Sequence, residues 1–387
     1  MTAITATAYV LLEDGARFDG LACGADEAAV GEIVFTTSMS GYQEAMSDPS
    51  YAGQLITFTC PQVGNYGVST EAMESDRVHA RAAIMRAGVD YKREHASAAG
   101  AERGWLSWLT DCGIPAITDL DTRALVRHIR DAGAMRGGLF PARVGEARAR
   151  ELIDSEPAMS GRDLAREVTP RKPVVLAAEG AQSADGPQIA MIDTGVKLSI
   201  LGNLRRRGAT VTLHPCTATA EELLAGGPDA VFLANGPGDP AALDYVVDTV
   251  RGLVGKLPVY GICLGHQLLC RAVGLETYKL PFGHHGANHP VKDLTTGRTE
   301  ITSQNHGFAV LGPDGARTID RDEAVRWETD FGLAELTHIN LYDRTVEGLT
   351  LRDVQGATVQ YHPEAGPGPH DALYLFDRFI GEIRAAA

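Results

Sequence analysis

The sequence has no excess of positive charge and no long apolar run. Its 387 residues include 35 lysines and arginines against 50 aspartates and glutamates, for a formal net charge of −15. An acidic chain without a basic stripe argues against a nucleic-acid partner. No apolar run approaches the roughly 18 residues of a membrane span, and residues 1–15 lack the pattern of a secretory signal. We therefore expect neither a nucleic-acid nor a membrane partner.

The six cysteines form no CxxC pair, which argues against a disulfide framework and against a zinc site. Most of them are expected to be small buried apolar residues. A reducing cytoplasm is the natural location for such a chain.

The composition, 44% hydrophobic and 22% charged, is that of a globular protein, and the length of 387 residues predicts two or three domains. A Pro-rich and then Ala/Gly/Ser-rich stretch predicts a linker over residues 169–187. It separates an N-terminal domain, residues 1–168, from a C-terminal domain, residues 188–387.

The N-terminal part mixes short alternating strands with helices, which predicts a smaller mixed α/β domain. Leu125 and Ile129 are expected on one face of a helix. The predicted strands are Ala8–Leu12, Glu32–Thr36 and Leu55–Thr59, and the predicted helices are Ser107–Asp111 and Asp121–Arg130.

The C-terminal part alternates strands and helices, which predicts an α/β fold with a doubly wound, mostly parallel sheet. Ligands of such sheets bind at the carboxyl ends of the strands. The predicted strands are Ile189–Asp193, Ala209–Leu213, Ala230–Ala234 and Leu257–Tyr260, and the helices are Lys197–Arg207, Ala218–Leu224 and Tyr245–Leu253.

Cys263 follows the last of these strands and stands between two glycines, Gly261 and Gly265. This is the G-x-nucleophile-x-G elbow with Cys in place of Ser. A strand that turns at once into a helix strains the nucleophile, and side chains on either flank would clash. The helix N-terminus favours the thiolate. We expect Cys263 to be a nucleophile.

A base for this thiol is found in His362-Pro363-Glu364, at the end of another short strand. Residues i and i+2 of an extended segment project to the same side. Glu364 is therefore expected to hold the imidazole of His362 while the imidazole faces Cys263.

The loop from Asn235 to Ala241 lies between a strand and a helix and fits G-x-G-x-x-A. Pro237 and Pro240 remove two backbone donors that a pyrophosphate loop would use, which disfavours a dinucleotide site. The N–H groups of Gly238 and Leu264 are predicted instead to form an oxyanion hole.

Two further polar runs are expected to be irregular. The run 303–308 is predicted to be a turn whose amides grip a small polar substrate. The histidine-rich run 283–289 is interpreted as a structural or interface loop, and since its spacing matches no ligand template we expect no metal.

These motifs resemble the triad-type class I glutamine amidotransferases. The resemblance narrows to the small, glutamine-hydrolysing subunit of carbamoyl-phosphate synthase and covers essentially the whole chain outside the linker. It is carried by the Cys263 elbow, the Asn235–Pro240 loop, His362–Ala365, Phe282–Pro290, Gln304–Phe308, Gly31–Phe35, Ser38–Glu44, Asp48–Tyr51 and Asp119–Arg123.

The resemblance implies that Cys263 attacks the amide of L-glutamine while His362, oriented by Glu364, moves the protons. It implies that glutamine is held by Ser50, Gly236, Gly238, Leu264, Gln267, Asn305, Gly307 and Phe308. It also implies a separate large subunit that uses ATP, with Mg, to make carbamoyl phosphate for arginine and pyrimidine synthesis. We expect no cofactor in this chain itself.

Three alternatives stay open. The chain could be a non-catalytic scaffold, against which the intact Cys263, His362 and Glu364 argue. It could be an amidotransferase of another pathway, such as anthranilate or guanylate synthesis, against which the N-terminal motifs argue. It could also be a dinucleotide-binding oxidoreductase, which the two prolines disfavour.

Overall fold

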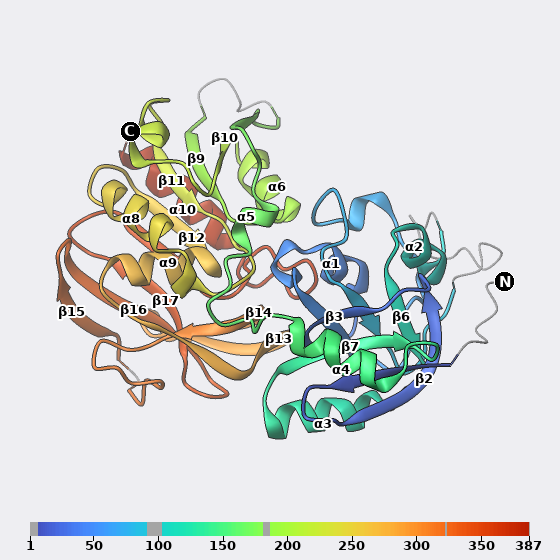
Figure 1. Ribbon diagram of the computed structural model, residues 1–387. Helices are drawn as coiled ribbons and strands as arrows, with labels where there is room; N and C mark the ends of the chain where they lie inside the picture. The colour runs from blue at the N-terminus through green and yellow to red at the C-terminus, as the bar shows by residue number, and fades with distance from the viewer. Residues whose placement is uncertain (1–6, 91–102, 181–185, 322, 387) are drawn as a thin grey trace. The chain divides into compact units, whose positions relative to one another are not determined.

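The computed structural model describes residues 7–90, 103–180, 186–321 and 323–386 (Figure 1). Residues 1–6 and 91–102 of the predicted N-terminal domain, 181–185 of the predicted linker, and 322 and 387 of the predicted C-terminal domain lie outside the described residues. Every residue predicted to belong to the functional site is described.

The chain divides into two compact units, and each is described here by itself. The first runs to Arg162 and includes Pro281–Gly286, and the second consists of Asp163–Leu280 and Ala287–Ala387. The division therefore falls a few residues before the predicted linker. A short segment from late in the chain joins the first unit, which a reading of local sequence could not foresee.

The first unit is built on a closed barrel in which the strands follow the order β1-β2-β6-β5-β4-β3-β7. The neighbours from β3 through β4 and β5 to β6 are parallel, and the other pairs are antiparallel. The predicted strands are confirmed, whereas closure into a barrel was not predicted. The strands are β1 (Thr7–Leu12), β2 (Arg17–Gly24), β3 (Ala29–Thr36), β4 (Gln54–Phe58), β5 (Ala82–Ile84), β6 (Pro115–Thr118) and β7 (Met135–Pro141).

Helix α3 (Thr122–Ala132) begins at Asp121, whose side chain accepts a hydrogen bond from the backbone N–H of Ala124. Leu125 and Ile129 are fully buried, as their spacing predicted. The other helices of this unit are α1 (Tyr42–Ser47), α2 (Trp105–Asp111) and α4 (Glu146–Ser155), with the 3-10 turns η1 (Pro49–Tyr51) and η2 (Thr70–Ala72).

The second unit confirms the predicted α/β fold. Strands β10, β9, β11, β12 and β18 form a parallel core in that order. The elements of this core are β9 (Gln188–Asp193), α6 (Leu198–Arg206), β10 (Thr210–Pro215), α7 (Ala220–Leu224), β11 (Ala230–Leu233), η5 (Pro240–Ala242), α8 (Asp244–Leu253), β12 (Val259–Ile262), α9 (Leu264–Ala272), β18 (Gly356–Val359) and α10 (Tyr374–Ala386).

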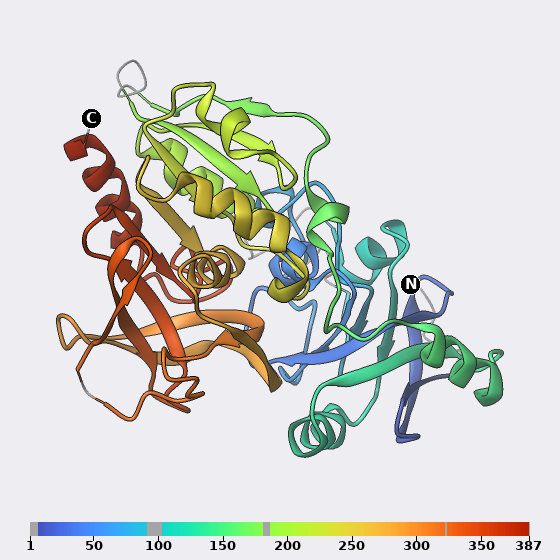
Figure 2. The same cartoon turned by 60° about the vertical axis from the view of Figure 1, so that its left-hand side comes forward.

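Helices cover both faces of this parallel core (Figure 2). In β9, Ile189 and Met191 pack with residues of α6 and α10, whereas Ala190 and Ile192 pack with residues of α7, α8 and α9. This alternation is what a strand buried on both faces requires, and the sheet is therefore doubly wound.

The sheet continues beyond β18 as an antiparallel extension that the strand–helix alternation did not indicate. The extension carries the two runs predicted to be irregular, and that prediction was wrong: residues 283–289 lie in β13 and residues 303–308 in β14. Its strands are β13 (Thr277–Asp293), β14 (Thr299–Val310), β15 (Val325–Thr329), β16 (Gly332–Asn340) and β17 (Val346–Leu351).

The region between the two predicted domains is also partly ordered. It contains α5 (Ala165–Val168) and β8 (Val174–Leu176), and β8 pairs antiparallel with β10 at the edge of the sheet. Among the described helices, none has the length and apolar composition that a bilayer crossing requires.

Candidate active site

Cys263 occupies a sharp turn between β12 and α9. It is the N-cap residue of α9, its φ is 56° and its ψ is −107°, and its side chain is buried. A non-glycine residue with positive φ is strained, and such strain persists only where the surrounding structure enforces it. The predicted elbow is therefore present, with the sulfur at the start of a helix.

The two flanking glycines are required by close packing. A Cβ on Gly265 would lie 2.3 Å from the carbonyl oxygen of Leu233 in β11, and a Cβ on Gly261 would lie 3.0 Å from the backbone of Gly265. The backbones of β11 and α9 therefore approach too closely for any side chain at Gly265, as the spacing of the motif predicted.

The parallel pairing of β12 with β18 brings the distant end of the chain to the elbow. Ile262 stands opposite Val359, and the backbone N–H of Cys263 donates to the carbonyl of Val359 at 2.9 Å. Both strands present their carboxyl ends here, and the residues that follow β18 therefore begin beside Cys263.

His362 and Glu364 are fully buried and paired, as the His-Pro-Glu motif predicted. The Nδ1 atom of His362 lies 2.6 Å from Oε1 of Glu364. The other ring nitrogen, Nε2, is buried, and the Cys263 sulfur is among the groups that act on this imidazole. The Cys263 thiol itself lies 3.7 Å from the carbonyl oxygen of Asn305 in β14.

The charge state of His362 follows from its neighbours. Burial by itself lowers the pKa of the imidazole, but the Glu364 carboxylate and the Cys263 sulfur outweigh it, and the pKa lies well above its ordinary value. The arrangement therefore favours an imidazolium at His362, held between the Glu364 carboxylate and the Cys263 sulfur.

A buried lysine, which no sequence motif indicated, completes this cluster. Lys197 is the N-cap residue of α6, just beyond the carboxyl end of β9, and its side chain is 2% exposed. Its ammonium donates to Oε1 of Glu364 at 3.0 Å, to the carbonyl of Ala365 at 2.7 Å and to that of Gly366 at 3.0 Å. The only sequence signal was its place at the carboxyl end of a predicted strand.

The lysine sets the charge of the Glu364 carboxylate. Burial by itself raises the pKa of Glu364. The Lys197 ammonium, and after it the His362 imidazolium, lower this pKa by more than burial raises it, and the pKa therefore lies well below its ordinary value. Glu364 therefore stays ionised in the interior because two cations share it.

The Asn235–Pro240 loop lies at the end of β11, next to the elbow. Gly236 packs closely against the backbone of Thr194. A Cβ added at Gly236 would lie 2.0 Å from the carbonyl oxygen of Thr194 and 3.1 Å from the side chain of Leu264. Gly238 has a φ of 94°. Asp239 caps the short turn η5, which begins with Pro240. The loop thus leads into a 3-10 turn, which agrees with the sequence argument against a dinucleotide site.

Strand β14 carries the remaining residues of this unit that were predicted to contact glutamine. Asn305, Gly307 and Phe308 lie on it, and the carbonyl of Phe308 accepts from Nε2 of Gln267 at 2.8 Å. The same Nε2 also donates to Oε1 of Gln360 at 3.0 Å. Both amide hydrogens of Gln267 are therefore used inside the protein.

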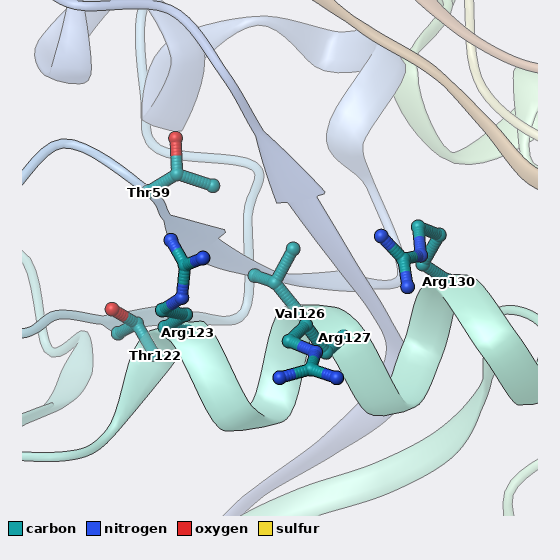
Figure 3. Close-up of a pocket in the computed structure, with 6 residues that line it drawn as sticks. All are labelled: Thr59, Thr122, Arg123, Val126, Arg127 and Arg130. Atoms are coloured by element: carbon teal, nitrogen blue, oxygen red, sulfur yellow. The ribbon is translucent and has the colours of Figure 1, made fainter.

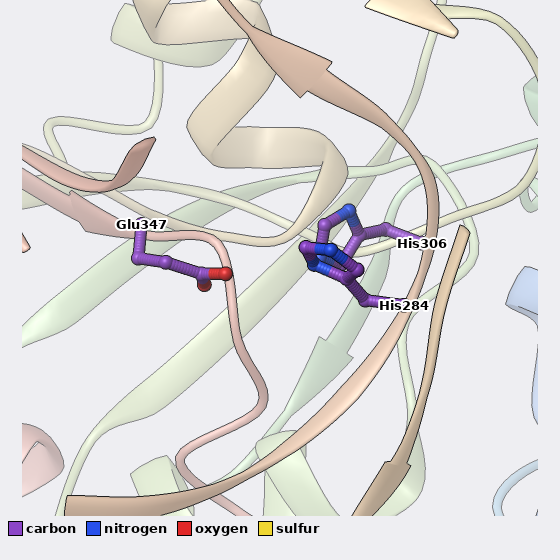
Figure 4. A group of neighbouring side chains, drawn as sticks. All are labelled: His284, His306 and Glu347. Carbon is purple, nitrogen blue, oxygen red and sulfur yellow. The ribbon is translucent and has the colours of Figure 1, made fainter. Parts of the chain in front are cut away.

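A buried polar network lies behind this strand, and Figure 4 shows two of its members, His306 and Glu347. The His306 ring contacts the Phe308 carbonyl through Nδ1 at 2.7 Å and Oε1 of Gln304 through Nε2 at 2.9 Å. Glu347 accepts from Gln304 and Asn340, each at 3.0 Å.

These bonds explain why the polar run forms a strand, since its side chains satisfy one another in the interior. They also engage both ring nitrogens of His306 and both oxygens of Glu347 with protein partners, and we assign no metal to this pair. His284, also labelled in Figure 4, belongs to the part of β13 that is assigned to the first unit.

Ser50 belongs to the first unit, in the turn η1, where its backbone N–H donates to the side chain of Asp48 at 2.8 Å. Its predicted contact with glutamine stays a prediction.

The sequence matches two families, one after the other. Residues 10–139 match the carbamoyl-phosphate synthase small chain, CPSase domain, and residues 190–381 match the class I glutamine amidotransferases. The first match covers much of the barrel unit, and the second covers the elbow, the Asn235–Pro240 loop and the His-Pro-Glu motif.

Individual relatives agree with the family matches over nearly the full length. The chain is 44% identical to the carbamoyl phosphate synthase small chain of Syntrophotalea carbinolica, with 96% of each chain covered. It is 44% identical to that of Listeria innocua, with 96% of this chain and 95% of the relative covered, and 41% identical to that of Polynucleobacter asymbioticus, with 98% and 96% covered. At this identity and coverage, the chain belongs to the carbamoyl phosphate synthase small chain family.

Proposed function

We propose that this chain is the glutamine-hydrolysing subunit of a carbamoyl-phosphate synthase. The observation that carries the proposal is the buried Cys263–His362–Glu364 triad at the carboxyl ends of two adjacent parallel strands. Family membership supports the substrate, since the relatives are named as small chains of this synthase. A scaffold without chemistry would have no need to keep a strained cysteine and a buried ion-pair cluster.

In the first half of the reaction, the Cys263 sulfur attacks the side-chain amide carbon of glutamine, and Nε2 of His362 holds the thiol proton. The carbonyl oxygen becomes an oxyanion, and the N–H groups of Gly238 and Leu264 stabilise it; one such donor contributes about 2.7–4 kcal/mol in other enzymes. The carbon–nitrogen bond breaks, His362 gives its proton to the leaving nitrogen, and ammonia departs from a glutamyl thioester.

In the second half, water attacks the thioester carbon while Nε2 of His362 takes one of its protons. The carbon–sulfur bond breaks, the proton returns to the sulfur, and glutamate is released. Throughout, Glu364 holds Nδ1 and Lys197 holds Glu364, and the imidazole therefore keeps its orientation in both halves.

The remaining predicted contacts bind the substrate. Gln267 has spent both amide hydrogens on Phe308 and Gln360, and its Oε1 is therefore the atom we assign to the glutamine ammonium. The other contacts proposed for glutamine are Ser50, Gly236, Gly238, Leu264, Asn305, Gly307 and Phe308.

The ammonia has a use only if another chain captures it. We propose a large subunit as partner, with the ATP and Mg needed for carbamoyl phosphate bound there and no cofactor in this chain. A cytoplasmic location is part of the proposal, and the absence of disulfides among the six cysteines supports it. The alternative, an amidotransferase subunit of another pathway, has no support in the family match of the first unit.

The test is Cys263→Ser, with Cys112→Ser as its control because Cys112 is exposed and lies in the first unit. Glutamine hydrolysis should fall by about 10⁴-fold or more, while free ammonia still supports carbamoyl phosphate synthesis by the assembled enzyme. The control should behave as the wild type in both assays. Near-normal glutamine hydrolysis by the Ser variant would rule out the proposed mechanism.

A further inference from the structure

The first unit has a pocket whose residues take no part in glutamine hydrolysis. It lies between Thr59, which follows β4, and helix α3, and has a volume of about 440 Å³ (Figure 3). That volume is within the range of small-molecule sites, about 300–1,000 Å³. The described residues that line it are Thr59, Thr122, Arg123, Val126, Arg127 and Arg130.

The lining is rich in donors. Three guanidinium groups offer about five N–H donors each, and two threonine hydroxyls are added to them. None of the described lining residues is acidic. Because the chain as a whole is strongly acidic, with a net charge of −15, a pocket lined by three arginines is a local reversal of sign that favours an anion.

Two of these arginines form no ion pair with any described residue. Arg130 pairs with its neighbour Asp131 at 2.7 Å, but within the described part of the chain no acidic side chain forms an ion pair with Arg123 or Arg127. Both are exposed. Elsewhere in this unit, arginines on helix α4 do have such partners: Arg148 pairs with Glu151 and Arg150 with Glu146.

The arrangement favours an elongated anion over a single charged group. Positions i, i+4 and i+7 share one face of a helix, and seven residues of helix extend over roughly 10 Å. Arg123 extends from α3 toward Thr59 in Figure 3, and Arg130 lies two turns further along the helix. Linked phosphates place charged oxygens along a line, which matches guanidinium groups spaced along one helix face better than a single phosphate or carboxylate does.

We infer that this pocket binds a small anion that carries two or more linked phosphate groups. The arginines contact the phosphate oxygens, the hydroxyls of Thr59 and Thr122 add hydrogen bonds, and the half-buried Val126 packs against the apolar part of the ligand. The site is separate from the residues proposed for glutamine hydrolysis, and the inference does not depend on the proposed function.

The experiment is calorimetric titration of the full chain at low salt with inorganic triphosphate, pyrophosphate and orthophosphate. We expect one site per chain, affinity decreasing in that order, and weaker binding as salt is added. The variant Arg123→Gln/Arg127→Gln should lose about tenfold or more in triphosphate affinity. The variant Arg148→Gln/Arg150→Gln, which removes the same charge from α4, should bind as the wild type does. Arg127→Gln alone serves if the first double variant fails to fold.

Several results would overturn the inference. These are no binding of triphosphate at millimolar concentration, equal losses in the two double variants, or citrate binding as tightly as triphosphate, which would assign the pocket to carboxylates. A further contradicting result is that no phosphate binds while Arg123→Gln/Arg127→Gln weakens association with a large subunit. The arginines would then form a protein contact, and the small-ligand site would be disproved.

Discussion

Positive charge is used in opposite ways in the two units. In the second unit, the single ammonium of Lys197 is buried and donates to a carboxylate and two carbonyls. In the first unit, Arg123 and Arg127 are exposed beside a pocket. A buried cation is tolerated only when it is fully paired, and it therefore acts on other protein groups. An exposed cation is solvated and can exchange water for a ligand.

Because of this difference in burial, loss of a charged side chain should have different effects on stability in the two regions. Around Glu364, removal of one member leaves the opposite charge buried and unpaired. Around α3, removal of one arginine leaves only water to fill its place. Glu364→Gln and Lys197→Met test this difference, with the larger expected effect first, and Arg127→Gln is the matched exposed variant.

Glu364→Gln should have the largest effect. It removes the carboxylate that raises the pKa of His362, and it leaves Lys197 without its charged partner. Glutaminase kcat/KM should fall by about 10²–10⁴-fold. The alkaline limb of the pH–rate profile should also move to lower pH, because the imidazolium then loses its proton earlier. An alkaline limb at the wild-type position would show that Glu364 does not set the charge of His362.

Lys197→Met should destabilise the second unit by about 3–5 kcal/mol, because it leaves Glu364 buried without the strongest of its counter-charges. Hydrogen exchange of peptides from β12 and β18 measures the loss of local stability around Glu364. Arg127→Gln is the matched loss of one positive charge. It should change the free energy of opening measured by hydrogen exchange in its own unit by less than about 0.5 kcal/mol.

The pH dependence has a defined sign. The lowered pKa of Glu364 stabilises the fold above the ordinary carboxyl pKa, and this contribution is lost as pH falls through the folded-state value. The difference in stability between the wild type and Lys197→Met should therefore be largest near neutral pH and shrink in acid.

Equal destabilisation by the Lys197 and Arg127 variants would remove the contrast between the two regions.

Gly265→Ala tests the packing of the elbow without changing any charge. Its Cβ would lie 2.3 Å from the Leu233 carbonyl, which should cost roughly 1–3 kcal/mol of stability and reduce glutaminase activity. Gly381→Ala in α10 is the control, since apart from the backbone of its own helix nothing lies within 4 Å of its added Cβ. That variant should be stabilised by about 0.5–1 kcal/mol. Thermal unfolding and activity of both variants check the prediction.

Much of the second unit was predictable because its signals are local. Each strand of the parallel core was predicted to within about two residues, and Cys263, His362 and Glu364 were identified from glycine spacing and a His-Pro-Glu run. The antiparallel extension was not predicted, because buried hydrogen bonds among Gln304, His306 and Glu347 make a strand look as polar as a turn.

The sequence by itself determined the elbow, the order of the motifs and the family to which they belong, because these depend on residue types at short spacing. The tertiary structure alone decided that the strands of the first unit close into a barrel, that Lys197 holds Glu364, and that α3 and Thr59 enclose an arginine-lined pocket. These features join segments far apart in the chain, and only the pairing of strands and the packing of helices determines which distant side chains meet.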